Sequence, residues 1–220
     1  MAWSAIPVVL FPFFFVVAVA LVFPSRTRRI RRAMAQATRR TIAAFGDGEE
    51  ARIAGIVRPG DCLTAPLSGR RCVYHELVLL EEDSDGDTTL LETSQGLPFV
   101  LEDGTGRALI DPAGAQVAIA QAEHAREGRL DVSIPSHEQL LLLHGLASAR
   151  DKPLRFRERV IPPGARIAVL GRALREPDPD GAALAQGYRL GPPTRLRLGG
   201  SAAHPLLVSD DAGEAARAEA

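Results

Sequence analysis

The chain has 220 residues, 46% of them hydrophobic, and a formal net charge of −1 at pH 7. This length suits one ordinary domain together with an anchor. Seven arginines and no acids lie between Arg26 and Arg40, so 19 basic residues remain against 27 acidic ones and residues 41–220 sum to −8. Because affinity for nucleic acids comes largely from neutralised phosphates, we expect no nucleic-acid partner.

An apolar segment opens the chain. Residues 1–25 carry no ionisable side chain, and Ala5 to Phe23 is a run of 19 uncharged residues. Because about 20 apolar residues in a helix cross the ~30 Å core of a bilayer, we predict a transmembrane helix within residues 1–25. A cleaved signal peptide is the main alternative, but it would carry basic residues before the apolar run and small residues at a cleavage site behind it. Here no basic side chain precedes the run, and PSRTRRIRR follows it.

A basic cluster follows the apolar segment. Its five arginines are Arg26, Arg28, Arg29, Arg31 and Arg32. Basic residues beside a span stay in the cytoplasm, so we expect a single-pass protein of the cell membrane with its N-terminus outside and its C-terminal domain cytoplasmic. The arginines would also bind anionic headgroups, at about 1 kcal/mol per charge near the surface. The alternative is that they serve only as a topology signal.

Residues 26–45 are predicted to form a basic juxtamembrane helix. Ile30, Met34, Ala37 and Ile42 recur at roughly helical spacing between the arginines, and the sequence Gly-Asp-Gly follows them. Apolar residues at this spacing are typical of an amphipathic helix, and glycines commonly end one.

Residues 50–208 are predicted to form one mainly β domain. Short apolar runs are separated by Gly, Pro and Asp and recur at intervals of roughly ten residues. The predicted strands are 51–57, 72–81, 97–103, 107–112, 166–174, 187–190 and 194–198. Many short strands of this kind favour a small OB-like open barrel or a sandwich with one or two accessory helices.

One accessory helix and a polar tail are also predicted. Ser136 and Gln139 have the spacing of a capping box ahead of the run QLLLLHGL, so a helix is expected there. Residues 209–220 are polar and rich in alanine, and we predict a disordered tail.

The stretch LTAPLSGRRCVYHE, residues 63–76, brings a thiol, an imidazole and two guanidinium groups together. We interpret it as a turn that leads into a strand, with Arg70 and Arg71 at the solvent edge and Cys72 as a small core residue. The alternative is a partner or ligand groove formed by Arg70, Arg71, Glu102 and Asp103.

The two cysteines, Cys62 and Cys72, could form a disulfide or remain thiols, and a cytoplasmic domain favours thiols. Together with His75 they supply three potential zinc ligands where four are needed. In a strand, residues 72 and 75 face opposite sides, which argues against a metal site and also against a Cys–His nucleophile pair.

Two short motifs resemble sites without completing them. In DSDGD, residues 83–87, three acids match the first ligands of a calcium loop, but Thr88 replaces the required glycine and Ser94 the bidentate glutamate. The EDGTG sequence, residues 102–106, is interpreted as a hairpin turn. We therefore expect no metal, no cofactor and no catalytic residue.

Three blocks in order resemble the GIDE ("beside a membrane") domain family of membrane-anchored E3 ubiquitin ligases. They are APLSGRRCVYHELVLLEE (65–82), LPFVLEDGTGRALIDPAGAQV (97–117) and RERVIPPGARIAVLGRAL (157–174). The resemblance covers roughly Ile53 to Val208, and it is to a bacterial-type member without the RING finger. The eukaryotic ligases carry two spans and a RING, and two cysteines cannot ligate the two zincs of a RING. The resemblance therefore implies the domain without the ligase activity.

These observations lead to a non-catalytic, membrane-anchored interaction module that binds the bilayer and an unidentified protein. Two alternatives remain open: an enzyme or ligase accessory that acts near Cys72 and Asp103, and a subunit of a membrane transport or secretion complex.

Overall fold

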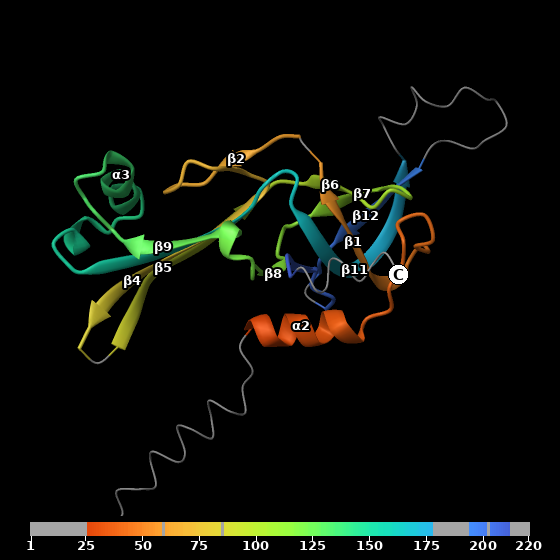
Figure 1. Cartoon of the computed structure of the whole chain (residues 1–220), viewed down its shortest axis with the longest axis horizontal. Helices are drawn as coiled ribbons and strands as arrows, with labels where there is room; N and C mark the ends of the chain where they lie inside the picture. The colour runs from red at the N-terminus through yellow and green to blue at the C-terminus, as the bar shows by residue number, and fades with distance from the viewer. Residues whose placement is uncertain (1–25, 59, 85, 178–193, 202, 212–220) are drawn as a thin grey trace, which may run out of the picture.

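The structure is a computed structural model that describes residues 26–58, 60–84, 86–177, 194–201 and 203–211. Over these residues it is mainly β, with two lobes side by side and two α-helices (Figure 1). The helices are α2 (Arg26–Gln36) and α3 (Pro135–Leu143), and the 3-10 turns are η2 (Ala122–His124) and η3 (Ala147–Ala149). The strands are β1 (Glu50–Val57), β2 (Leu63–Thr64), β3 (Arg71–Cys72), β4 (Tyr74–Asp83), β5 (Gly86–Gly96), β6 (Phe99–Glu102), β7 (Arg107–Asp111), β8 (Gln116–Ala118), β9 (Ala125–Arg129), β10 (Leu154–Ile161), β11 (Arg166–Pro177), β12 (Thr194–Gly199) and β13 (Leu207–Ser209).

One lobe is a closed barrel of five strands. The ring runs β1–β6–β7–β12–β11 and closes through antiparallel pairing of β11 with β1. Counted in chain order, its strands are arranged first, second, third, fifth and fourth, and only the pairing of β7 with β12 is parallel. Strands β13 and β8 extend the sheet beyond β11. The mainly β class is thus confirmed, but the barrel is closed where an open barrel or a sandwich was expected.

The other lobe is a four-stranded sheet in the order β5–β4–β10–β9. It is assembled from two insertions into the barrel. The hairpin β4–β5 comes from the connection between the first two barrel strands, and β9 and β10 come from the connection between the third and the fourth. The register of β4 against β5 shifts between Leu79 and Leu80, which marks a β-bulge in this hairpin.

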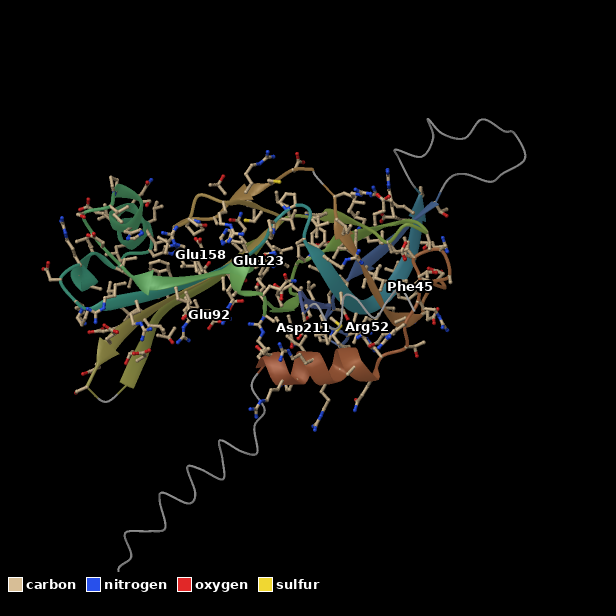
Figure 2. All side chains as sticks on the ribbon, in the orientation of Figure 1. Phe45, Arg52, Glu92, Glu123, Glu158 and Asp211 are labelled. Carbon is tan, nitrogen blue, oxygen red and sulfur yellow. The ribbon has the colours of Figure 1, made fainter. Side chains whose placement is uncertain are left out.

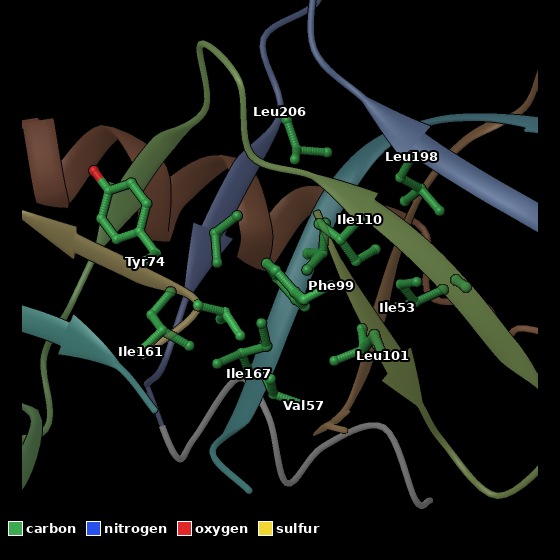
Figure 3. Packing of buried hydrophobic residues seen from close by; sticks show 14 of the residues in the cluster. Ile53, Val57, Tyr74, Phe99, Leu101, Ile110, Ile161, Ile167, Leu198 and Leu206 are labelled. Atoms are coloured by element: carbon green, nitrogen blue, oxygen red, sulfur yellow. The ribbon is translucent and has the colours of Figure 1, made fainter. Parts of the chain in front are cut away.

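The barrel strands are apolar on both faces because both faces are covered. Along β11, Ile167 and Val169 belong to the barrel core, while Ala168 and Leu170 lie on the outer face and contact α2. Strand residues alternate between faces, so a strand buried on both sides is a nearly continuous apolar run. This explains why RIAVLGRAL was recognisable as a strand. Figure 3 shows the barrel core. Its largest members include Ile53, Leu101, Ile110, Ile167 and Leu198.

A second apolar cluster lies between the four-stranded sheet and α3. Its members are Leu77, Leu79, Leu140, Leu141, Ala149, Leu154 and Phe156. Helix α3 follows Ile134 with Pro135 at its first position, and no side chain caps it. The predicted helix is therefore confirmed, but the predicted Ser136–Gln139 capping box is wrong, since proline needs no partner for a missing N–H.

Helix α2 packs against the outside of the barrel. Ile30 and Met34, four residues apart on one face of the helix, are almost completely buried in a cluster with Ala54 and Ala168 of the barrel and Ala118 of β8. The predicted helix over residues 26–45 is too long, because α2 ends at Gln36.

The chain beyond α2 pairs with β1 in place of continuing the helix. The Arg52 amide donates to the Thr38 carbonyl at 2.8 Å, and the Arg40 amide donates to the Arg52 carbonyl at 2.9 Å. Ile42 and Phe45 then enter the barrel core. Ile42 was assigned to the apolar stripe of a helix, whereas it is buried in the barrel.

The predicted disordered tail, residues 209–220, begins too early. Ser209 ends strand β13, and both Ser209 and Asp210 are fully buried. The Asp210 carboxylate accepts hydrogen bonds from the Ala120 amide at 2.5 Å and contacts His124 Nδ1 at 2.7 Å. Burial of a carboxylate requires such partners.

Most predicted strands are confirmed. The expected strand 72–81 is interrupted by a bend at Val73, which separates β3 from β4. The expected strand 187–190 and the transmembrane helix in residues 1–25 fall outside the described residues. Within the described part of the chain, no helix is both long enough and apolar enough to cross a bilayer.

Candidate functional site

The turn between β2 and β3 has the shape that the sequence predicted. The Gly69 amide donates to the Ala65 carbonyl at 3.0 Å, and Gly69 adopts a left-handed conformation with φ of 64°. Glycine takes that conformation without strain. Arg71 is exposed, and Arg70 donates from Nη1 to the carbonyl of Glu123 at 2.8 Å. Arg70 thus links the turn to the start of β9.

A buried carboxylate that the sequence analysis missed fixes this turn. Glu158 on β10 accepts the Leu67 amide at 2.7 Å and the Ser68 amide at 3.0 Å, and the residue is only 2% exposed. Figure 2 shows Glu158 on the lobe that contains the four-stranded sheet. In the sequence RFRERV, Glu158 shares one strand face with Phe156 and Val160, and the half-buried arginines occupy the other face. This alternation is the sequence signal that could have identified the buried carboxylate.

Glu102 lies in a groove on the barrel. Its carboxylate accepts hydrogen bonds from Arg58 Nε at 2.5 Å and from Arg107 Nε at 3.3 Å. The hydrogen bond from Arg58 lowers the pKa of Glu102. The groove has a volume of about 440 Å³, with Ala54 and Ile56 in its lining and charged side chains that include Arg58 and Arg166. These charges suit a polar partner.

Asp103, in the same groove, organises the chain. Its Oδ1 atom accepts the Thr105 amide at 2.8 Å and the Gly106 amide at 3.1 Å, which forms the β6–β7 turn. Its Oδ2 atom accepts the Ile42 amide at 2.7 Å and thereby holds the segment after α2 on the barrel. All these bonds serve the fold, so the structure gives Asp103 a positioning role.

The four residues of the predicted partner surface therefore lie in two places. The groove that contains Glu102 and Asp103 has neither Arg70 nor Arg71 in its lining. Strands β2 and β3 form a separate two-stranded ribbon, whereas β6 belongs to the barrel. The groove arginines at positions 58 and 166 carried no motif that could have marked them.

Cys72 and His75 do not form a reactive pair in this arrangement. Both cysteines are free thiols, and Cys72 is packed among Ala65, Val160 and Leu63. Burial raises the pKa of the Cys72 thiol to about 11, which disfavours the nucleophilic thiolate. His75 is buried as well, and burial lowers its pKa. Cys72 is thus a small core residue, as the sequence predicted.

The acidic hairpin at residues 83–87 forms the turn between β4 and β5, of which Asp85 lies outside the described residues. Asp83 accepts hydrogen bonds from Ser84, its sequence neighbour. Nowhere in the described ranges do three or more His, Cys, Asp or Glu side chains gather as potential metal ligands.

The basic cluster lies on α2, and the barrel fixes its orientation. With Ile30 and Met34 turned toward the barrel, a rotation of about 100° per residue places Arg28 and Arg32 on the opposite side. All five arginines are exposed in whole or in large part. Arg26 contacts Glu92 at 3.9 Å and Arg31 contacts Asp211 at 2.8 Å, whereas Arg29 and Arg32 have no ion-pair partner in the described part of the chain.

Fold and surface together define a two-lobed β protein built on a closed five-stranded barrel, with charged grooves and a basic helix on its side. A family model described as "GIDE: E3 Ubiquitin ligase" matches residues 76–181, from within β4 to just past β11. This match of the GIDE family model to residues 76–181 agrees with the resemblance seen in the sequence. The match includes the four-stranded sheet apart from Tyr74 and His75, together with barrel strands β6, β7 and β11, while β1 and β12 lie outside it. Comparisons with curated proteins and with solved structures found no match.

Proposed function

We propose that this protein is a non-catalytic interaction module that is anchored in the membrane by its first 25 residues and that holds a partner protein beside the bilayer. The observation that carries the proposal is the attachment of α2 to the barrel. Because Ile30 and Met34 are locked into the barrel surface, the outward arginines form part of a rigid domain. A rigid basic face that directly follows an uncharged 19-residue run is suited to contact with anionic headgroups.

The barrel supports the binding part of the proposal. Its strand order, with the fifth strand between the third and the fourth, is the order of an OB-like barrel. Such barrels bind their ligands with loops and with an exposed sheet face. The excess of acid in residues 41–220 disfavours a nucleic acid there and leaves a protein as the partner we propose.

The structural roles of Cys72 and Asp103, the two residues of the enzyme alternative, support a non-catalytic role. The Cys72 thiol is buried and resists ionisation, and the oxygen atoms of Asp103 are occupied by backbone amides. The family description names E3 ubiquitin ligases, but the two cysteines of this sequence cannot ligate the two zincs of a RING. The family relationship therefore supports a shared domain, and we propose no ligase activity.

Membrane fractionation with protease protection tests this proposal. The full chain should remain with the membrane in carbonate washes. Protease added to spheroplasts should spare the region 41–220, and protease added to inverted vesicles should digest it. A protein released as a soluble, shortened chain, or one digested only from outside the cell, would contradict the anchor or the orientation.

A further inference from the structure

The second lobe has an open edge next to the start of α2. Strand β5 pairs with β4 alone among the described strands, so the backbone groups on its other side are outside the ladder. Strand β5 spans 11 residues, which is longer than the usual five or six. Exposed edges of this length pair readily with another extended chain, and proteins usually shorten, charge or cover them. From Leu91 to Gly96, on the barrel side of the bulge, the register with β4 is regular.

A polar recess of about 260 Å³ adjoins this part of β5. Glu76 on β4 and its cross-strand neighbour Ser94 share one face of the sheet, and Glu92 and Tyr74 lie on the same face. Arg26, from the first turn of α2, completes the lining. Figure 2 shows Glu92 on the part of the lobe that lies nearest to α2. The recess therefore presents two carboxylates directly beside the free edge.

Glu76 is the unusual member of the recess. The residue as a whole is 9% exposed, and its side chain has no hydrogen bond or ion pair with any residue in the described ranges. Arg159 lies opposite Glu76 on β10, yet it forms no ion pair with Glu76. Arg26 is 3.9 Å from Glu92, and both side chains are largely exposed. The Glu76 carboxylate is not among the fully buried side-chain groups without a hydrogen-bond partner, and it faces the recess, so a cation placed there would pair with it.

We propose that β5 and the recess bind an extended segment of a partner protein, which adds to the sheet beside β5 and places a lysine or arginine side chain against Glu76 and Glu92. Backbone hydrogen bonds would provide the affinity, and the basic side chain would provide the selectivity, as in other cases of strand addition. A second copy of this chain is a poorer occupant, because the antiparallel register that pairs two β5 strands about the point between Thr89 and Leu90 would place Glu92 of each copy opposite Asp87 of the other.

The inference rests on the proposed interaction role and names the partner chemistry for it. It also predicts selectivity between the two edges of the sheet. Strand β9, the opposite edge, spans only five residues, Ala125–Arg129, and includes two arginines. A basic segment should therefore bind at the β5 edge and not at the β9 edge.

Peptide binding to the full chain in nanodiscs tests the inference. The probes are fluorescent eight-residue peptides of alternating threonine and valine, with a central lysine, arginine or norleucine. The lysine and arginine peptides should bind at least tenfold more tightly than the norleucine peptide and should slow hydrogen exchange in residues 91–96. N-methylation of alternate peptide amides should abolish binding.

Two variants and one control locate the site. Glu76→Gln should lower the affinity for the basic peptides at least tenfold. Ser94→Lys should abolish their binding, because the new cation lies opposite Glu76 and occupies the recess itself. Glu127→Gln removes the same charge from exposed β9 and should leave binding unchanged. Circular dichroism should show that all three variants fold.

The inference is overturned if neither basic peptide exceeds norleucine, if Glu127→Gln acts like Glu76→Gln, or if protection appears away from β5. These outcomes are independent of the proposed membrane role. Glu76→Gln should leave fractionation and protease protection unchanged, and a failure of those two measurements alone would leave peptide binding at β5 intact.

Discussion

The two lobes of the molecule bury different kinds of side chain. The barrel closes on itself around an almost entirely apolar core, with α2 covering part of its outside. The four-stranded sheet keeps two edges, and its strands carry the buried residues Glu76, Glu158 and His75. A closed ring of strands has no edge with unpaired backbone groups, so apolar packing can hold it. The open sheet joins its two insertions by the pairing of β4 with β10, by the apolar cluster against α3 and by the hydrogen bonds that Glu158 accepts from the amides of Leu67 and Ser68.

The largest effect should come from the barrel core. Leu101→Ala on β6 removes a fully buried side chain, so we expect the free energy of unfolding to fall by about 3 kcal/mol. Leu91→Ala on the half-exposed edge strand β5 should cost less than about half of that, because less apolar surface returns to water. Urea denaturation of both variants measures the difference. Equal losses would contradict the view that the barrel provides most of the stability.

The next effect concerns the contact between the β2–β3 turn and the four-stranded sheet. Glu158→Ala leaves two backbone amides without their acceptor, and we expect a loss of about 2 kcal/mol in unfolding free energy. Hydrogen exchange should accelerate in residues 65–70, while the barrel strands stay protected. Glu127→Ala on exposed β9 is the matched control and should change neither measurement. If residues 65–70 keep their protection, Glu158 does not hold the turn.

The smallest effect is a dependence of stability on pH. Burial lowers the pKa of His75, so the unfolded chain takes up this proton before the folded one does. The contribution of His75 to stability is therefore complete above the pKa of an unfolded histidine and is lost as the pH falls through the folded value.

Thermal unfolding between pH 8 and pH 5 measures this effect. His75→Gln should flatten the acid side of the profile, and His144→Gln, at an exposed position, should not. Parallel profiles for the parent and His75→Gln would show that burial of His75 does not destabilise the folded protein at acidic pH.

The sequence predicted what depends on local pattern. Alternating and continuous apolar runs revealed most strands, and Gly69 and Gly104, both with positive φ, marked two of the turns. It did not predict the four-stranded sheet, because the pairing of β4 with β10 joins residues about 80 positions apart, a distance over which periodicity carries no information. The sequence also predicted a helix that continues through Ile42, because Ile42 has the spacing of one more residue on the apolar face of that helix. In the structure Ile42 lies in the barrel core.

The candidate site was harder to predict for the same reason. Glu102 lies in a groove, but its partner Arg58 is 44 positions away in the sequence. Arg70 and Arg71, which the sequence analysis grouped with Glu102 and Asp103, lie outside that groove. Glu76 and Glu158 were not singled out from the sequence, and the neighbouring strands and turns bury them.

The central claim is that the barrel holds α2 with its arginines toward the membrane. The most direct test attaches a fluorophore to exposed Ala35→Cys in a Cys62→Ser background and measures quenching by lipids that carry a spin label in the headgroup. In nanodiscs that contain phosphatidylserine the fluorophore should be quenched strongly, and Arg29→Glu with Arg32→Glu should remove most of that quenching. A fluorophore at exposed Ser148→Cys, beyond α3, should not be quenched. Equal quenching at the two positions, or quenching that is unchanged in the glutamate variant, would contradict the account.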